Sequence, residues 1–405
     1  MTDSLDRFRT RARTWLEGHA RPSIESPAGR RDPGQRAAAV ARAREFQRQL
    51  FDADLAALCW PVAYGGQGLP SAFQQAFNDE SADFQLPVGP LTVGLGMCGP
   101  TLLAVGTEEQ RTRFVPPLVR GEDLWCQLFS EPGAGSDLAA VSTIARRDAG
   151  AWVLSGQKVW TSGGHDADWG AALARTDPDV PKHAGITMFI VDMSAPGVTV
   201  RPLRQMNGEA DFDEVFLDEV RVPDAHVLGG IDQGWPAALT MLTSERVAVA
   251  GGGAGIGRRG LGVQSFIALA HAKSKTADPI GRQRLVDLYV HEAALSYLEA
   301  RLREGALAPA AGSLAKLVTA RLAKDLSSSG VDLLGPAGVA GDAGDAGDGP
   351  GGAEWVRLLL SAPSYSIGGG TDEIQKNVVG ERVLGLPREP QADRNMPFRD
   401  VPAGR

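Results

Sequence analysis

Cysteine is scarce in this 405-residue chain, which contains only Cys59, Cys98 and Cys126. None of the three belongs to a C-x-x-C pair, and three are too few for a disulfide framework or a common zinc site. We therefore expect no bound metal. The pattern excludes a small disulfide-stabilised secreted fold and favours a reducing cytoplasm.

Long apolar runs and a surplus of positive charge are also missing. No run of eighteen apolar residues occurs, and the charged N-terminal stretch lacks the apolar segment of a signal peptide. We therefore expect neither a membrane span nor secretion. With 41 Lys and Arg against 49 Asp and Glu, the net charge is −8. A chain this acidic has no general affinity for nucleic acid or for an anionic membrane surface.

Apolar periodicity divides the chain into three parts and a tail, which is too much for one ordinary core. Residues 1–121 have a helical pattern, residues 122–230 contain short β-branched and aromatic segments, and residues 231–390 are helical again. Residues 391–405 form the tail. The fold class is therefore predicted as α+β, with a middle antiparallel β domain between two helical domains.

Some elements carry specific signals. Thr107 and Gln110 form a capping-box pattern, which predicts a short helix ending near the Pro116–Pro117 pair. The chain after Pro387 is expected to be loosely held. The predicted strands are these: Ala151–Trp160, Ala171–Arg175, Ile186–Asp192, Val198–Leu203 and Glu214–Val222.

Glycine motifs are weak signals in this chain, because its fifty glycines produce such matches by chance. Three G-x-G-x-x-G matches begin at Gly94, Gly255 and Gly347, but none lies between a strand and a helix of a βαβ unit. A nucleotide-binding domain of that type is therefore rejected. The aspartate- and glycine-rich segment 341–352 is interpreted as a flexible loop rather than a calcium-binding repeat.

Three other segments carry chemistry. The first runs from Gln127 to Asp137 (QLFSEPGAGSD) and combines hydroxyl groups with glycines that allow close backbone approach. The second, Lys158 to Gly164 (KVWTSGG), offers a tryptophan that can cover a ring system. The third, Ser366 to Gln375 (SIGGGTDEIQ), places three glycines before a helix start. Taken singly, the first and third segments are better explained as ordinary turns, and the second is equally compatible with one.

In this order and spacing, the three segments resemble the acyl-CoA dehydrogenase family. The resemblance covers most of the chain, from Trp60 to Pro387. It implies a helical N-terminal domain, a middle β domain and a C-terminal four-helix bundle. It also implies FAD as cofactor, an acyl-CoA substrate and an electron-transfer flavoprotein as electron acceptor.

By this resemblance, several residues acquire roles. Ser136 lies by the acyl-CoA as well as the cofactor, Gly370 lies near the substrate, and Met241 lines the substrate pocket. Phe129, Ser130, Trp160 and Ser162 meet the flavin ring, and Thr371 and Glu373 hold FAD from the far side. The cofactor-binding set is Gln127, Phe129, Ser130, Ser136, Trp160, Thr161, Ser162, Thr371, Asp372 and Glu373.

The reaction needs a carboxylate to remove the α-proton and a donor to polarise the thioester carbonyl. Many family members carry a glutamate just before a Gly-Thr pair, but this chain has Gly369 there. Glycine keeps its backbone N–H, so it can polarise the carbonyl without accepting a proton. A subset of the family places the base in a Glu-Arg pair on an earlier helix, which predicts Glu245 as the base here. A solvated surface glutamate is the alternative.

Two positions depart from the family pattern for contacts between subunits. Most family members have an Arg-x-x-Phe-Gly segment, for which this chain offers Lys273 or Arg282 instead. Most also have a Gln before a Gly-Gly pair, and here Asp332 precedes Gly335-Pro336. Such members resemble subunits of two-component assemblies acting on bulky acyl-CoAs, including steroid side chains. We expect a homo-oligomer or a heterotetramer with a related subunit. The alternatives are a non-catalytic partner subunit and a flavin oxidase or monooxygenase on the same fold.

Overall fold

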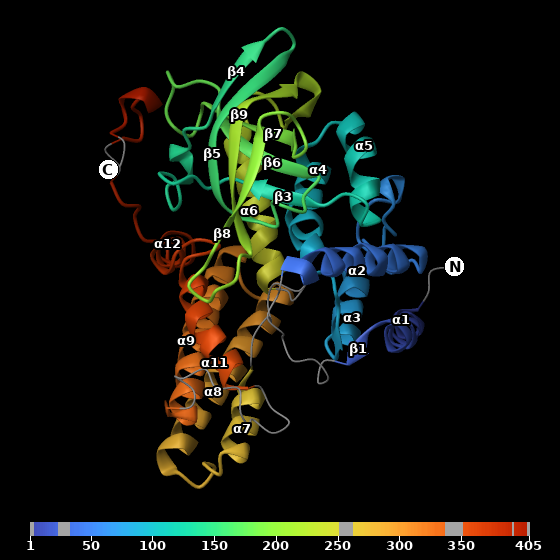
Figure 1. Ribbon diagram of the computed structural model, residues 1–405, viewed down its shortest axis with the longest axis vertical. Helices are drawn as coiled ribbons and strands as arrows, with labels where there is room; N and C mark the ends of the chain where they lie inside the picture. Colours follow the sequence, from blue (N-terminus) through green and yellow to red (C-terminus); the bar gives the residue numbers. More distant parts are fainter. Residues whose placement is uncertain (1–3, 23–32, 251–261, 337–350, 391–392, 403–405) are drawn as a thin grey trace.

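The computed structural model describes residues 4–22, 33–250, 262–336, 351–390 and 393–402. Along the chain, N-terminal helices are followed by a mainly antiparallel sheet and then by C-terminal helices, which confirms the predicted α+β class. In Figure 1 the sheet is at the top, the N-terminal helices are at the right and the C-terminal helices extend downward. Among the described helices, none is both long enough and apolar enough to cross a membrane.

The N-terminal helices form the first layer, together with a short pairing of β1 (Arg21–Pro22) and β2 (Phe84–Gln85). The helices are α1 (Leu5–His19), α2 (Pro33–Asp52), α3 (Ser71–Ser81), α4 (Gly99–Val105) and α5 (Glu108–Val119).

Helices α1 and α3 pack through apolar side chains. Phe8, Ala12 and Leu16 recur along one face of α1 and are fully buried, as helical periodicity requires. The ring of Phe8 meets that of Phe73 edge-on, with centroids 5.1 Å apart. Burial of this face is the main stabilising contribution, because the large side chains of Phe8 and Leu16 each contribute about 1.5–3 kcal/mol.

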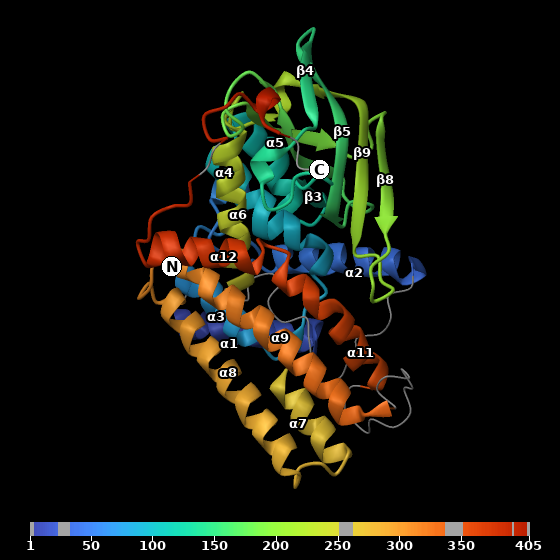
Figure 2. The same cartoon turned by 90° about the vertical axis from the view of Figure 1, so that its left-hand side faces the viewer.

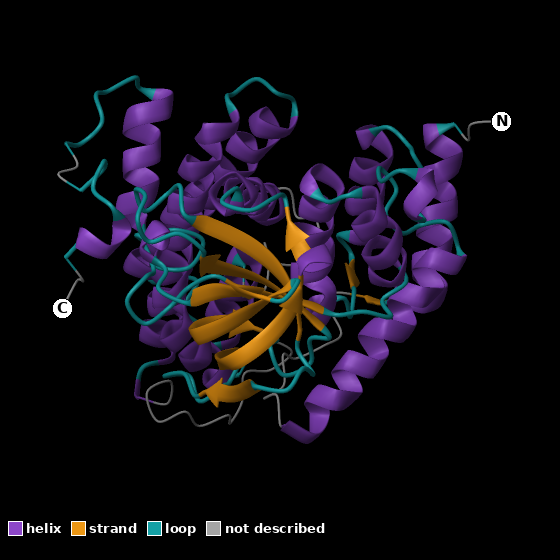
Figure 3. Cartoon of the chain, turned by 90° about the horizontal axis from the view of Figure 1, so that it is seen from above, coloured by secondary structure: helices purple, strands orange, loops and turns teal. Residues whose placement is uncertain are grey.

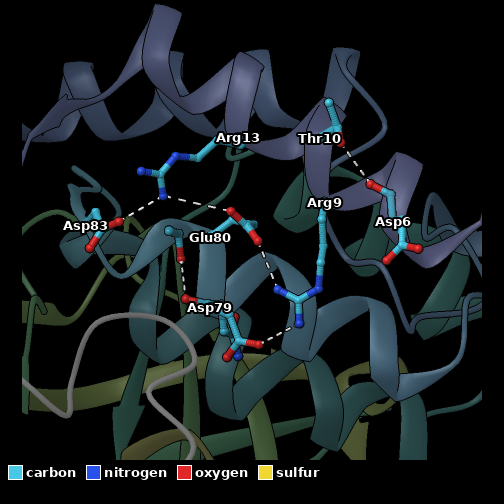
Figure 4. Close-up of polar contacts among 9 residues, drawn as sticks. Asp6, Arg9, Thr10, Arg13, Asp79, Glu80 and Asp83 are labelled. Atoms are coloured by element: carbon cyan, nitrogen blue, oxygen red, sulfur yellow. Dashed lines mark hydrogen bonds and ion pairs between the residues drawn. The ribbon is translucent and has the colours of Figure 1, made fainter.

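Ion pairs cover the outer side of the same contact (Figure 4). Arg9 binds Asp79 at 2.8 Å and Glu80 at 2.9 Å, and Arg13 binds Asp83 at 2.8 Å. These side chains are partly exposed, so each pair contributes only about 0–1 kcal/mol. The ion pairs therefore fix the orientation of α1 on α3 but add little to the stability of the contact.

The capping box that opens α5 is confirmed. Gln110 N donates to Thr107 Oγ1, and Thr107 N donates to Gln110 Oε1. The predicted end near the Pro116–Pro117 pair is confirmed, since α5 ends at Val119, two residues further on. The two prolines lie inside its last turns, and Leu118 and Val119 beyond them are buried.

The middle domain is an eight-stranded sheet with the order β10-β7-β6-β4-β5-β9-β8, and β3 pairs with β6 off this path. Two pairings with β6 are parallel, those of β3 and the start of β4. The strands are β3 (Trp125–Leu128), β4 (Ile144–Asp148), β5 (Ala151–Ser162), β6 (Trp169–Arg175), β7 (Ile186–Asp192), β8 (Val198–Leu203), β9 (Phe212–Pro223) and β10 (Val227–Leu228).

The central strands are buried on both faces, because helices cover one side and the curled sheet covers the other (Figure 3). On β6, Ala171 and Leu173 join the core shared with the N-terminal helices and α6, whereas Ala172 and Ala174 join the core inside the sheet. This alternation follows the two-residue period of a strand. It attaches the β domain directly to the helices.

The C-terminal helices form an elongated bundle (Figure 2). Its core includes Phe266, Leu288, Leu326 and Trp355, all almost fully buried. The helices are α6 (Gly234–Ala250), α7 (Val263–Ala272), α8 (Pro279–Arg303), α9 (Gly312–Leu334), α11 (Gly352–Ser361) and α12 (Asp372–Val378). Most of the predicted 341–352 loop lies outside the described residues.

The prediction of a loosely held tail is wrong for residues 393–402. Phe398 N donates to Val180 O at 2.9 Å, and Arg399 N donates to Pro178 O at 3.0 Å. The tail therefore returns from the helical bundle to the β domain. Sequence composition alone does not show such pairing, because its partners lie about two hundred residues earlier.

Close packing in the bundle predicts one sharp effect on stability. A Cβ at Gly330 would lie 1.9 Å from Trp355 Cε3, whereas a Cβ at Gly312 on the same helix meets nothing within 4 Å. We expect Gly330→Ala to lower the free energy of unfolding by about 1–3 kcal/mol through overpacking. Gly312→Ala should change it by less than about 0.5 kcal/mol. Equal urea denaturation midpoints for the two variants would contradict this packing.

Candidate functional site

A buried ion pair joins the first two chemistry-bearing segments. Lys158 on β5 is fully buried, and its Nζ donates to Glu131 Oε1 at 2.7 Å. The same ammonium donates to the backbone oxygens of Phe129 at 3.2 Å and Leu173 at 2.7 Å. All three N–H donors of the lysine are thus used. One side chain therefore links the loop after β3 to strands β5 and β6.

The carboxylate of Glu131 is equally well satisfied. It accepts from Ser142 N and Oγ, both at 2.7 Å, and from Thr143 N at 2.9 Å. Burial alone would raise the pKa of Glu131, but the Lys158 ammonium and these hydrogen bonds outweigh it and lower the pKa to about 2. Glu131 is therefore ionised at neutral pH and serves as an anchor rather than as a proton acceptor.

The segment held by this ion pair is open on its outer side. Ser130 O accepts from Val159 N at 2.9 Å, which ties the two segments together through their backbones. A Cβ added at Gly133 or Gly135 would meet nothing within 4 Å. Ser136 is exposed at the tip. The loop is thus fixed at its base and accessible along its glycines.

Trp160 is the strongest indication of a ligand site. It has a φ of 60° and a side chain that is 59% exposed, at an irregularity in the pairing of β5 with β9. A bulky residue rarely adopts positive φ, and such strain costs about 1–3 kcal/mol and concentrates at functional sites. Phe212 supports the indole edge-on, with ring centroids 5.8 Å apart. The indole surface is free to cover a flat ligand.

Two buried polar atoms in the first two segments have no hydrogen-bond partner within the described ranges. They are Gln127 Nε2 and Thr161 Oγ1. Leaving such groups unpaired costs about 1–3 kcal/mol each. Together with the exposed indole, they suit a planar ligand that carries hydrogen-bonding groups at its edge.

The turn after Ser162 is anchored from below by a buried carboxylate. Asp213 on β9 is 0% exposed, and it accepts from His165 N at 3.0 Å and contacts His165 Nδ1. Arg36 of α2 reaches Asp166 in this turn at 2.6 Å. Neither Asp213 nor the Lys158–Glu131 pair was among the site residues predicted from the sequence. The sequence offered no signal for Asp213, because its place opposite Thr161 depends on a strand register that only the structure shows.

The third segment lies on the C-terminal helices, where α12 packs against α9. Gly369 and Gly370 have φ values of 67° and 89°, which is the left-handed region that glycine tolerates. Thr371 caps α12, because its side chain accepts from Ile374 N. Glu373, predicted to bind the cofactor, is exposed on the first turn of α12.

Asp372, also predicted to bind the cofactor, already has cationic partners. Its carboxylate lies 3.5 Å from Lys316 Nζ and 3.7 Å from Lys324 Nζ. Burial would raise the pKa of Asp372, but the Ser366 hydroxyl and the two lysines lower it overall. Asp372 therefore belongs to the support of the glycine loop.

The predicted residues on α6 are placed differently. Met241 is 0% exposed and packs in the core shared with the N-terminal helices, so it presents no surface to a ligand in this conformation. Residue 245 lies one turn further along α6, and its side chain lies outside the described residues.

Family models match nearly the whole chain. Residues 2–122 match the N-terminal domain of acyl-CoA dehydrogenase, residues 126–220 the middle domain and residues 232–384 the C-terminal domain. The chain belongs to the acyl-CoA dehydrogenase family. Members of this family are flavoproteins and oxidoreductases.

Individual relatives agree with this assignment. The acyl-CoA dehydrogenase IpdE1 of Mycobacterium tuberculosis is 37% identical, over 95% of this chain and 98% of its own. The Tcur3481–Tcur3483 steroid ACAD has a TM-score of 0.75 at 27% identity, covering 96% of this chain and 99% of that one. The ChsE4–ChsE5 complex from Mycobacterium tuberculosis has a TM-score of 0.73 at 28% identity, with coverage of 96% and 99%.

The buried ion pair predicts a large effect of a single substitution. Lys158→Met leaves the Glu131 carboxylate buried and unpaired, so we expect a loss of about 3–5 kcal/mol in the free energy of unfolding. The matched control is Arg147→Met on β4, whose pair with Asp224 is exposed and contributes about 0–1 kcal/mol. Urea denaturation measures both. Similar losses for the two variants would show that the buried pair does not hold the loop.

The lowered pKa of Glu131 predicts a specific dependence on pH. Its folded pKa of about 2 lies below the value of about 4.3 for an unfolded glutamate. The stability that it contributes is therefore fully present above about pH 5 and is lost as the pH falls toward 2. We expect the stability difference between wild type and Glu131→Gln to narrow over this range in denaturation experiments. A difference that stays constant from pH 7 to pH 3 would refute the assignment.

Proposed function

We propose that the chain catalyses the FAD-dependent α,β-dehydrogenation of an acyl-CoA thioester to the 2-enoyl-CoA. The observation that carries the proposal is the exposed indole of Trp160 in a strained backbone, together with the unpaired buried groups of Gln127 and Thr161 in the same two segments. Such an arrangement suits the edge and face of a flavin ring. Family membership supports the same reading.

Most of the proposed site residues would contact the cofactor. Phe129, Ser130, Trp160 and Ser162 would hold the flavin ring, with Thr371 on the opposite side. The remaining cofactor contacts in the proposal are Gln127, Ser136, Thr161, Asp372 and Glu373. When bound, FAD supplies the acceptor for the hydride that leaves the β-carbon.

Glu245 is the proposed base. Positions 238, 241 and 245 fall on one face of α6, and Ala238 and Met241 on that face are fully buried against the N-terminal helices. Gly369 lacks a carboxylate, so its proposed role is limited to polarising the thioester carbonyl through its backbone N–H.

We propose a bulky acyl group, including steroid side chains, as the substrate class. Similarity to a steroid ACAD over nearly the whole chain supports this class. Gly370 and Ser136 are proposed to lie along the substrate. An electron-transfer flavoprotein is the proposed electron acceptor, and three free cysteines favour a cytoplasmic location.

The proposed assembly uses the outer face of α8, as a homo-oligomer or a heterotetramer with a related subunit. This face exposes large apolar side chains, which marks an interaction surface. They are Ile280, Val286, Tyr289, Val290 and Tyr297. A relative of known structure forms a complex of two chains, ChsE4 and ChsE5. Asp332, on the neighbouring α9, pairs with Arg284 at 2.8 Å, which offsets the repulsion that it would otherwise exert on a phosphate.

One observation favours a second possibility, a partner subunit that does not itself catalyse the reaction. Gly369 removes the carboxylate from the position that most members use. The flavin absorbance of the chain purified alone separates the two possibilities. A flavin-free chain that gains activity only with a second subunit would favour the partner role.

Substitution of the proposed base tests the function directly. We expect acyl-CoAs, from short to steroid-sized, to bleach the flavin anaerobically, with bulky ones most effective. Glu245→Gln should keep its flavin and lower the rate of bleaching by about 10²–10⁴-fold, because the general base is lost. Glu304→Gln, an exposed change at the end of α8, is the control. Near-normal turnover by flavin-loaded Glu245→Gln would eliminate Glu245 as the base.

A further inference from the structure

A lysine from α9 reaches the backbone of the glycine loop. Lys316 Nζ donates to Gly370 O at 2.7 Å and lies 3.5 Å from Asp372 Oδ1. The side chain of Lys316 is only 14% exposed. Burial lowers the pKa of Lys316, although Asp372 opposes the shift. Burying an ammonium is costly unless it is hydrogen-bonded, so this contact is specific rather than incidental.

A second side chain holds the adjacent carbonyl. Gln375 on α12 is 3% exposed, and its Nε2 donates to Gly369 O at 2.6 Å. The same amide lies so close to the loop that a Cβ at Gly370 would be 2.7 Å from it. Two consecutive carbonyl oxygens are therefore held by two different helices.

Holding these carbonyls fixes the direction of the neighbouring N–H groups. No described peptide bond is cis, and in a trans peptide the N–H points away from the carbonyl of the same group. The Gly369 carbonyl thus sets the direction of Gly370 N–H, and the Gly370 carbonyl sets that of Thr371 N–H. Gly369 N–H, the proposed donor to the thioester, belongs to the preceding peptide group. The two contacts therefore act on it through the left-handed conformation of Gly369, whose φ is 67°.

A neighbouring lysine shows that proximity alone does not give this arrangement. Lys324, two turns further along α9, donates to Ser366 Oγ at 2.7 Å and lies 3.7 Å from Asp372. Both of these contacts are with side chains rather than with a carbonyl of the glycine loop. Lys316 therefore has a distinct position among the cations of α9.

We propose that Lys316 and Gln375 are positioning residues, which hold the Gly369–Thr371 loop in the orientation needed to polarise the substrate thioester. The proposal rests on the function proposed above, since it names the residues that set the geometry of that site. Neither residue touches the substrate. Their effect is on the direction of the backbone donors, which a displacement of about 1 Å is enough to spoil.

The test compares Lys316→Met, Lys316→Arg and Arg321→Met in the full-length, flavin-loaded chain. Arg321 is the matched control, because it lies on the same helix and its pair with Asp325 is exposed. We expect Lys316→Met to lower kcat by about 10–100-fold with KM for acyl-CoA changed less than about twofold. Lys316→Arg should recover part of kcat, and Arg321→Met should match wild type.

Hydrogen exchange of the amides of residues 369–371 gives a readout that needs no turnover. We expect exchange in Lys316→Met to be at least about tenfold faster than in wild type, with Arg321→Met unchanged. Gln375→Leu should raise exchange at the same amides. Unchanged exchange and unchanged kcat in Lys316→Met would overturn the positioning role. If none of the acyl-CoAs tested bleaches the flavin of the wild type, the proposed function fails. The hydrogen-exchange result alone then decides whether Lys316 and Gln375 order the loop.

Discussion

The buried pair of Lys158 and Glu131 is the interaction on which the arrangement of the site depends. Removing two charges from water is costly, and the cost is offset here because every donor of the ammonium and both oxygens of the carboxylate are satisfied. The partners come from the loop after β3 and from strands β5 and β6. The pair therefore fixes the start of the glycine loop relative to Trp160. A strained, exposed tryptophan needs such a rigid support.

The site is divided between two parts of the molecule that differ in how they hold it. On the β domain, buried charges support exposed surface: Asp213 lies beneath the turn after Ser162 as Glu131 lies beneath the loop after Ser130. On the helical bundle, side chains bind backbone carbonyls of the glycine loop directly. Helix α6 connects the two parts, because its buried face packs against the N-terminal helices and the sheet.

Several features were predictable because their cause is local. The capping box of α5, the extents of β7 and β8 and the apolar face of α1 follow from short-range pattern. The two residues of α5 beyond Pro117 were not predictable, because distant packing stabilises its last turn. The ordered tail was missed for the same reason, since Phe398 is held by residues more than two hundred positions earlier.

The sequence by itself determined the family, the α+β architecture and the lack of a carboxylate at Gly369, because these depend on residue identity and spacing along the chain. Only the tertiary structure decided which polar groups are anchors and which are left for a ligand. Glu131 and Gln127 both belong to the first segment, yet one is fully paired and the other keeps an unpaired amide. Burial and pairing arise from contacts between segments far apart in sequence, so they cannot be deduced from local pattern. The same holds for Lys316, whose role appears only where α9 meets the glycine loop.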